Sequence, residues 1–161
     1  MIYKDYNDKK EITNHEMTYD IISKRKKKTI KILNPIDIYN EIKKYAKSDQ
    51  ELFLVLTLNP SHDIIGIHIA TKGLANKTVI HPREIFKHVF LDNATSLIIA
   101  HNHPSNVIIQ PSIEDKEITR QINEICELMQ IEFLDHLIIN KKSYYSFRVD
   151  GKIVNTSLLN Y

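Results

Sequence analysis

The sequence predicts a mixed α/β fold in which one β-sheet is flanked by helices. Apolar runs at residues 51–59 and 96–100 have the length and composition of buried strands. Around these runs, longer segments repeat apolar residues every three or four positions, which is the period of an amphipathic helix. With 161 residues, the chain can enclose one sizeable core but is too short for two ordinary domains. Together these features predict a single layered α/β domain.

Each predicted helix has a recognisable start. Asn34 and Pro35 begin the first, because Asn is a favoured N-cap and Pro fits the first turn. Pro82 begins the second helix and Ser112 the third. The apolar stripes expected to face the sheet are Ile38, Ile42 and Tyr45 on the first helix, Ile85, Phe86, Val89 and Phe90 on the second, and Ile118, Ile122, Ile125 and Met129 on the third.

The strands follow from apolar runs bounded by turn residues. Residues 51–59 form a continuous apolar strand that should turn at residues 60–63. The next strand is expected to alternate, with Ile65, Ile67 and Ile69 on one face. The remaining strands are expected at residues 96–100, 132–140 and 143–149.

Composition places the chain among globular proteins, with 42% hydrophobic and 26% charged residues. We expect residues 1–33 to form an N-terminal basic arm or lead-in strand, and residues 34–161 to form the folded domain. The single cysteine, Cys126, excludes a disulfide framework, and no signal peptide or long apolar span is evident. We therefore expect a cytoplasmic protein without a membrane partner. Cys126 is expected to be a small helix residue, since no neighbouring base would activate it.

A cluster of positive charge precedes the first helix. Six cationic side chains lie between Lys24 and Lys31. Such a run could follow nucleic-acid phosphates through electrostatics alone. More often it protects a solvated edge strand from aggregation. Because the net charge of the chain is only +2, we do not favour nucleic acid as a partner.

Residues suited to metal chemistry gather where a strand is predicted to end and the third helix to begin. His101 and His103 should project from the same side of the strand, which Pro104 then ends. Asp115 falls in the first helical turn, which can fold back over the strand end. Two imidazoles and a carboxylate are three ligands for a metal such as zinc, with the fourth position left for water. The same spacing also fits a strand, a proline turn and a helix closed by a Ser112 capping box.

Several blocks of the sequence, taken in order, resemble one known family. They are residues 51–59, 81–84, 100–105, 111–115, 134–139 and 144–147. These blocks resemble the RadC family, whose domains belong to the JAMM (MPN-plus) metallopeptidase group. The signature of that group is a distant Glu, then His-x-His, a spacer and Ser-x-x-Asp. The resemblance covers residues 34–151, although residues 106–110 replace the usual Gly and polar spacer with a longer apolar stretch.

The resemblance implies a JAB/MPN-like, cytidine-deaminase-like α-β-α sandwich in a short stand-alone form. It also implies one catalytic Zn²⁺ held by His101, His103 and Asp115. Glu51 matches the family's general base, which takes the proton of the metal-activated water. Ser112 would cap the helix and donate a hydrogen bond to the developing oxyanion.

Two function classes follow from the resemblance. The first is a zinc-dependent metallopeptidase-like hydrolase, which would cut peptide or isopeptide bonds in a protein or peptide substrate. The second is a factor of DNA repair or of mobile elements, which would act with nucleic acid and without proteolysis.

Other polar residues have alternative interpretations. Glu84 is a rival base, although a helix first turn favours Glu in any case. Arg83 could bind a substrate carbonyl or pair with a carboxylate, and we favour the pair. His136 could be a fourth ligand, a partner of a ligand or a strand histidine with its own hydrogen bonds, and we favour the last. The remaining histidines are expected to be surface or core residues: His15, His62, His68, His81 and His88.

Overall fold

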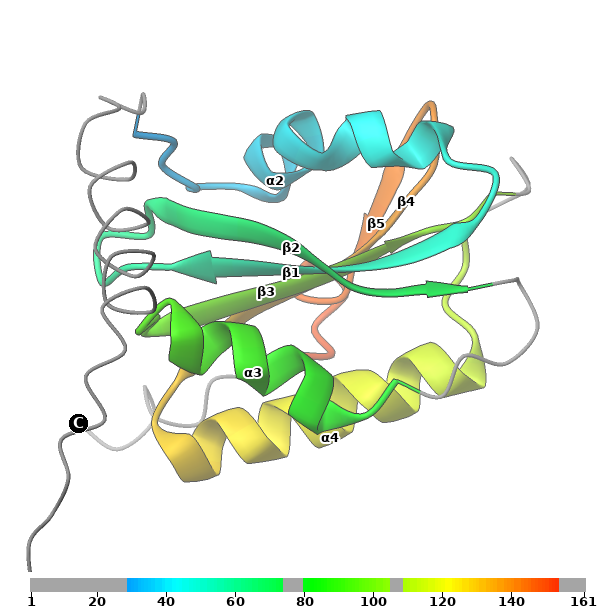
Figure 1. Ribbon diagram of the computed structural model, residues 1–161. Helices are drawn as coiled ribbons and strands as arrows, with labels where there is room; N and C mark the ends of the chain where they lie inside the picture. Colours follow the sequence, from blue (N-terminus) through cyan, green and yellow to red (C-terminus); the bar gives the residue numbers. More distant parts are fainter. Residues whose placement is uncertain (1–28, 74–79, 105–108, 154–161) are drawn as a thin grey trace, which may run out of the picture.

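The computed structural model describes residues 29–73, 80–104 and 109–153 of the chain. Within them, one five-stranded sheet has the strand order β2-β1-β3-β4-β5 (Figure 1). The strands are β1 (Glu51–Leu58), β2 (Ile64–Gly73), β3 (Ser96–Asn102), β4 (Glu132–Ile139) and β5 (Tyr144–Ser146). The helices are α2 (Pro35–Ile42), continued by the 3₁₀ helix η1 (Lys43–Lys47), α3 (Pro82–Leu91) and α4 (Ile113–Met129).

The sheet is mixed, as predicted. β1 runs antiparallel to both β2 and β3, and β4 runs antiparallel to β5. β3 and β4 are parallel, so the chain must cross over between them, and α4 forms this crossover. α4 thus begins 11 residues after the last residue of β3.

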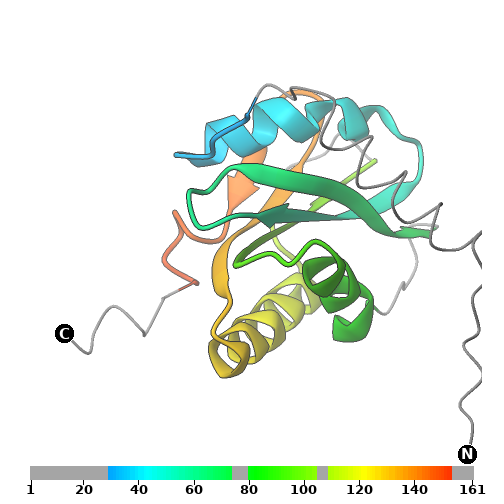
Figure 2. The ribbon, with the colours of Figure 1, turned by 60° about the vertical axis from the view of Figure 1, so that its left-hand side comes forward.

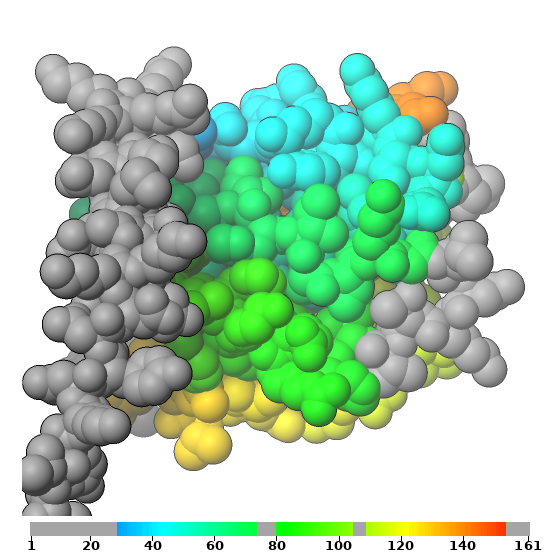
Figure 3. All heavy atoms as spheres, viewed as in Figure 1, coloured from blue at the N-terminus to red at the C-terminus, as the bar shows by residue number. Residues whose placement is uncertain are grey.

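Helices cover both faces of the sheet, which confirms the predicted α/β class. α2 and η1 lie on one face, and α3 and α4 lie on the other (Figures 1 and 2). In the space-filling view, α2, β2 and α3 form the near surface (Figure 3).

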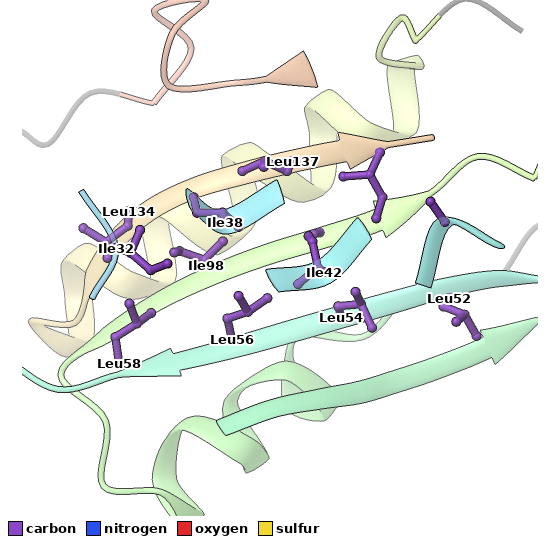
Figure 4. Close-up of a cluster of buried hydrophobic side chains, with 13 residues drawn as sticks. Ile32, Ile38, Ile42, Leu52, Leu54, Leu56, Leu58, Ile98, Leu134 and Leu137 are labelled. Atoms are coloured by element: carbon purple, nitrogen blue, oxygen red, sulfur yellow. The ribbon is translucent and has the colours of Figure 1, made fainter. Parts of the chain in front are cut away.

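The side chains of β1 divide the core between the two faces. Leu54 and Leu56 join the cluster under α2, where they meet Ile42 (Figure 4). Phe53 and Val55 join the second cluster, which also contains buried side chains of α3 and α4. A strand buried on both faces is apolar throughout, which explains the continuous apolar run in the sequence.

Two strand predictions are wrong in detail. β2 alternates as expected only from Gly66 to Ile69, which pair residue by residue with β1, because the register shifts at Ile65 and at Ala70. Ile65, at one of these shifts, and Ile69 are exposed, whereas Ile67 packs against the core. β5 has only 3 residues instead of the predicted 143–149. The backbone N–H of Arg148 donates to the Asp135 carboxylate rather than to a neighbouring strand, so the pairing stops.

Two helix predictions also need correction. On α4 the buried residues are Thr119, Ile122 and Cys126, and Met129 is 44% exposed. Met129 is the last residue of the helix, where Gln130 takes a left-handed conformation (φ 55°) and the chain leaves for β4. On α3, Phe90 contacts the Phe86 ring but is 60% exposed in the last helical turn. Both errors lie in the last turn of a helix. There the apolar pattern of the sequence continues, but the side chain is no longer packed on the sheet.

Some predictions concern parts of the chain outside the described residues. Most of the basic run lies there, and so do most of residues 106–110 and the proposed arm before residue 29. Lys31 is described, and it forms an isolated antiparallel bridge with Asp63. None of the helices in the described ranges is long and apolar enough to cross a membrane.

Candidate metal centre

The end of β3 brings two imidazoles to one side of the sheet. His101 is the second-to-last residue of β3 and faces the α4 side of the sheet. Its ring lies parallel to that of Phe53, with the ring centroids 6.0 Å apart. His103 follows the strand, and its backbone N–H donates to the carbonyl of Ile139 at 3.0 Å. Between them, the buried Asn102 amide accepts from the N–H of Leu52 at 2.7 Å. These bonds fix the backbone on both sides of the histidine pair.

Asp115 reaches the histidines from the first turn of α4. Ser112 is the N-cap of this helix, and its hydroxyl oxygen accepts from the N–H of Asp115 at 3.0 Å. The backbone N–H and the hydroxyl of Ser112 donate to Asp115 Oδ2 at 2.8 and 2.7 Å. The other oxygen, Oδ1, lies 3.2 Å from Nε2 of His101. The capping box therefore holds one carboxylate oxygen and directs the other toward the histidines.

The three side chains together form a possible metal site. One ligand atom from each of His101, His103 and Asp115 lies within 4.8 Å of the others. The two Nε2 atoms of His101 and His103 are 3.1 Å apart. A tetrahedral zinc ion with bonds of 2.0–2.1 Å separates its ligand atoms by about 3.3 Å. The spacing and the donor types both fit such an ion, and within the described residues no other group of this kind occurs.

Burial keeps the first ligand uncharged. His101 is 1% exposed, and burial lowers its pKa to about 4, with Asp115 opposing this shift and His103 adding to it. A neutral imidazole offers a lone pair to a metal without first losing a proton. His101 is therefore neutral near pH 7, as a histidine ligand of a metal must be.

Glu51 lies beside this cluster. It is the first residue of β1, two positions before Phe53, which pairs with His101 across the β1–β3 ladder. Because side chains alternate along a strand, Glu51 shares the α4 face with Phe53. Burial raises the pKa of its carboxyl group, His103 opposes that shift and Asp115 adds to it. The strand position expected for Glu51 is thus the observed one, while its role as a base stays a prediction.

His136 contacts the cluster from behind. Its Nε2 lies 3.0 Å from Nδ1 of His101, the nitrogen that points away from the candidate metal position. Its Nδ1 lies 2.6 Å from the hydroxyl of Thr119, which donates to the backbone carbonyl of Asp115 at 2.5 Å. His136 is therefore a buried strand histidine with its own hydrogen bonds, as we favoured, and one of its partners is the candidate ligand His101. Thr119 was missed, although its position four residues after Asp115 puts it on the same helix face.

The other candidates have their own partners elsewhere. Glu84 lies in the first turn of α3 and pairs with Arg83 at 3.2 Å and with Lys87 at 3.8 Å. The pair confirms the structural role favoured for Arg83. Cys126 is buried in α4, where burial raises its thiol pKa to about 12, so it is not an activated nucleophile.

The remaining described histidines lie away from the cluster, as predicted. His62 pairs with Glu132 at 2.9 Å, and His68 pairs with Asp92 at 2.6 Å. His88 stacks on His68 with the ring centroids 4.4 Å apart, and His81 is the N-cap residue of α3. His15 falls outside the described residues.

Residues 32–152 match the RadC-like JAB domain. The chain belongs to this family. Similar proteins include three named as UPF0758 proteins. The relative from Thermosynechococcus vestitus is 47% identical over 98 residues, covering 61% of this chain and 39% of its own length. The Clostridium botulinum relative is 42% identical over 125 residues, which are 77% of this chain and 54% of the relative. The Methanospirillum hungatei relative is 39% identical over 127 residues, which are 78% of this chain and 56% of the relative. The chain thus spans about half the length of the curated relatives it matches.

Proposed function

We propose that this RadC-like JAB domain is a zinc-dependent hydrolase of peptide or isopeptide bonds. The observation that carries the proposal is the convergence of His101, His103 and Asp115 within 4.8 Å at the open end of a parallel strand pair. Two imidazoles and one carboxylate are a ligand set of catalytic zinc sites, which leave one position for water. A structural zinc site would instead need a fourth protein ligand. His136 does not supply it, because its Nε2 contacts Nδ1 of His101, on the side of the ring away from the candidate metal position.

In this proposal Glu51 handles the proton. A bound zinc ion would lower the pKa of its water and polarise the scissile carbonyl group. Glu51 would be the residue that accepts a proton from the attacking water and returns it to the leaving amine. Burial raises the pKa of Glu51 above its ordinary value, which makes its carboxylate a stronger base than a solvent-exposed Glu. His103 opposes this shift of the Glu51 pKa.

In this proposal Ser112 has two roles: it orients the candidate ligand Asp115, and it donates a hydrogen bond to the substrate oxyanion. Its hydroxyl proton is donated to Asp115 Oδ2, so the hydroxyl must turn before it can donate to an oxyanion. When it turns, the backbone N–H of Ser112 still holds Oδ2 at 2.8 Å. Asp115 would then keep Oδ1 directed at the metal while the hydroxyl serves the substrate.

The substrate in this proposal is a protein or peptide. The alternative with nucleic acid depends mainly on residues 24–28, which lie outside the described part of the chain. The net charge of the chain is only +2, which does not favour a polyanion as the substrate.

Metal analysis of the purified protein tests the proposal. We expect the wild-type protein to bind one zinc ion per chain and His101→Ala to lose tight binding while its circular dichroism spectrum is unchanged. His62→Ala is the matched control, because His62 pairs with Glu132 instead of joining the cluster. Zinc retained at the wild-type level by His101→Ala would contradict the proposed ligand set. Incubation of the zinc-loaded protein with a peptide library, followed by mass spectrometry of new termini, tests the hydrolysis itself.

A further inference from the structure

We propose that Thr119 and His136 are positioning residues that determine which nitrogen of His101 carries the proton. They hold that proton on Nδ1 and so leave the Nε2 lone pair free for a metal. This inference rests on the proposed metal site. Its evidence is a chain of three hydrogen bonds that starts at the backbone carbonyl of Asp115 and ends at His101.

The direction of the chain is set at its Thr119 end. A hydroxyl group has one proton to donate, and a carbonyl oxygen can only accept. The hydroxyl oxygen of Thr119 lies 2.5 Å from the carbonyl oxygen of Asp115, so the proton must lie between these two oxygens. A threonine hydroxyl bonded to the carbonyl four residues earlier is a common arrangement within helices.

The remaining two bonds then have one solution. Since the Thr119 proton is already used, Nδ1 of His136 must donate to the Thr119 oxygen, which lies 2.6 Å away. A neutral imidazole carries one proton, so Nε2 of His136 is an acceptor. Within the described residues its hydrogen-bond partner is Nδ1 of His101 at 3.0 Å, and that nitrogen must therefore carry a proton. Nε2 of His101 then carries a lone pair instead of a proton, and it faces Nε2 of His103 at 3.1 Å and Oδ1 of Asp115 at 3.2 Å.

The opposite direction leaves the chain unsatisfied. If Thr119 donated to His136, its oxygen would lie 2.5 Å from the Asp115 carbonyl oxygen with no proton between them. Every proton would then shift by one place, and Nε2 of His101 would carry a proton where a metal should bind. Water cannot correct the mismatch, because His101, His136 and Thr119 are 1%, 0% and 3% exposed.

Packing prevents the rings from turning to other partners. The ring of His136 stacks on that of Phe147 with the centroids 4.6 Å apart and the planes at 5°. The ring of His101 lies parallel to that of Phe53 within 4°. The three hydrogen bonds also connect α4 to β3, because they join the backbone of one candidate ligand, Asp115, to the side chain of another, His101. Hydrogen-bond partners of metal ligands commonly change metal affinity by about 10- to 100-fold when removed.

Thr119→Val tests the inference, with Thr119→Ser as the conservative rescue. We expect Thr119→Val to weaken zinc affinity, measured by competition with a chromophoric chelator, by about 10- to 100-fold. We expect Thr119→Ser to restore it. The matched control is Thr57→Val, which removes a fully buried hydroxyl that bonds to Asp92 and should leave zinc affinity unchanged.

A second measurement reads the proton directly in the metal-free protein. Long-range ¹H–¹⁵N spectra distinguish the two neutral forms of histidine. We expect His101 to carry its proton on Nδ1 in the wild-type protein and to populate the Nε2 form in Thr119→Val. A wild-type His101 protonated on Nε2 would overturn the inference, and so would Thr119→Val with unchanged zinc affinity and unchanged spectra. A wild-type protein that binds no zinc but keeps the Nδ1 form would refute the proposed function and leave this inference standing.

Discussion

Replacing Glu51 with Gln removes a proton acceptor while preserving the shape of the side chain. The backbone at this point is fixed, because the N–H of the next residue, Leu52, donates to the buried Asn102 side chain at 2.7 Å. Gln can still form hydrogen bonds at the start of β1, but it cannot take a proton from water. General acid–base catalysis typically contributes 10²- to 10⁴-fold, or about 3–5 kcal/mol of barrier. We therefore expect Glu51→Gln to lose this factor in turnover and to retain its zinc.

The folded state should tolerate the change. Burial raises the pKa of Glu51 above its ordinary value, so folding is favoured by Glu51 when the group is protonated. That contribution is fully present at low pH and is lost as pH rises through the raised folded-state pKa. At pH 7 the ionised carboxylate therefore opposes folding, and the neutral Gln does not. We expect Glu51→Gln to unfold at the same denaturant concentration as the wild type at pH 7, or at a higher one.

The assay combines turnover on a cleaved library peptide, zinc content and denaturant unfolding for each variant. Glu84→Gln is the matched control, because Glu84 pairs with Arg83 and Lys87 on α3. Our assignment of the base would be refuted by an inactive Glu84→Gln protein beside an active Glu51→Gln protein. Loss of zinc from Glu51→Gln would instead make Glu51 a metal ligand.

Three further outcomes are expected. Chelation should leave the circular dichroism spectrum folded, because the candidate site lies at a strand end outside both hydrophobic clusters; unfolding would indicate a structural metal. Cys126 should resist alkylation at pH 8 until denaturant is added, because the thiol is buried and its raised pKa of about 12 keeps it protonated; rapid labelling of the native protein would contradict this packing. Ile122→Ala should lower the free energy of unfolding, measured with denaturant, by about 2–5 kcal/mol because Ile122 is fully buried. Met129→Ala should lower it much less, and a larger loss for Met129→Ala than for Ile122→Ala would show that Met129 is packed inward, as the sequence predicted.

Local patterns were enough to find the central strands but not the edges of the sheet. β1 and β3 are buried on both faces, so the apolar runs themselves mark their positions to within a residue or two. β2 lies at the edge and pairs with β1 through two register shifts, which no alternation rule anticipates. β5 ends early because Ser146 and Arg148 bond to the Asp135 side chain. These bonds join residues from two strands and are not visible in either segment alone.

The candidate site shows the same division between local and distant information. His101 and His103 follow from strand alternation, and Asp115 from the first turn of a helix, so short-range spacing brings out all three. His136 is 35 residues from His101 in sequence, and the contact depends on the parallel pairing of β3 with β4. The hydrogen-bond chain could therefore be found only once the strand order was known.

The two interpretations of the Ser-x-x-Asp spacing, a helix cap and a metal ligand, do not exclude one another. A carboxylate has two oxygens, and here they serve different groups. Oδ2 of Asp115 accepts from Ser112 at 2.8 and 2.7 Å, while Oδ1 lies 3.2 Å from His101. The helix start thus fixes the rotamer of Asp115 before any metal binds, which lowers the cost of ordering the site. A capping box next to a His-x-His strand end is consequently no argument against a metal site, because the cap is what aims the third ligand.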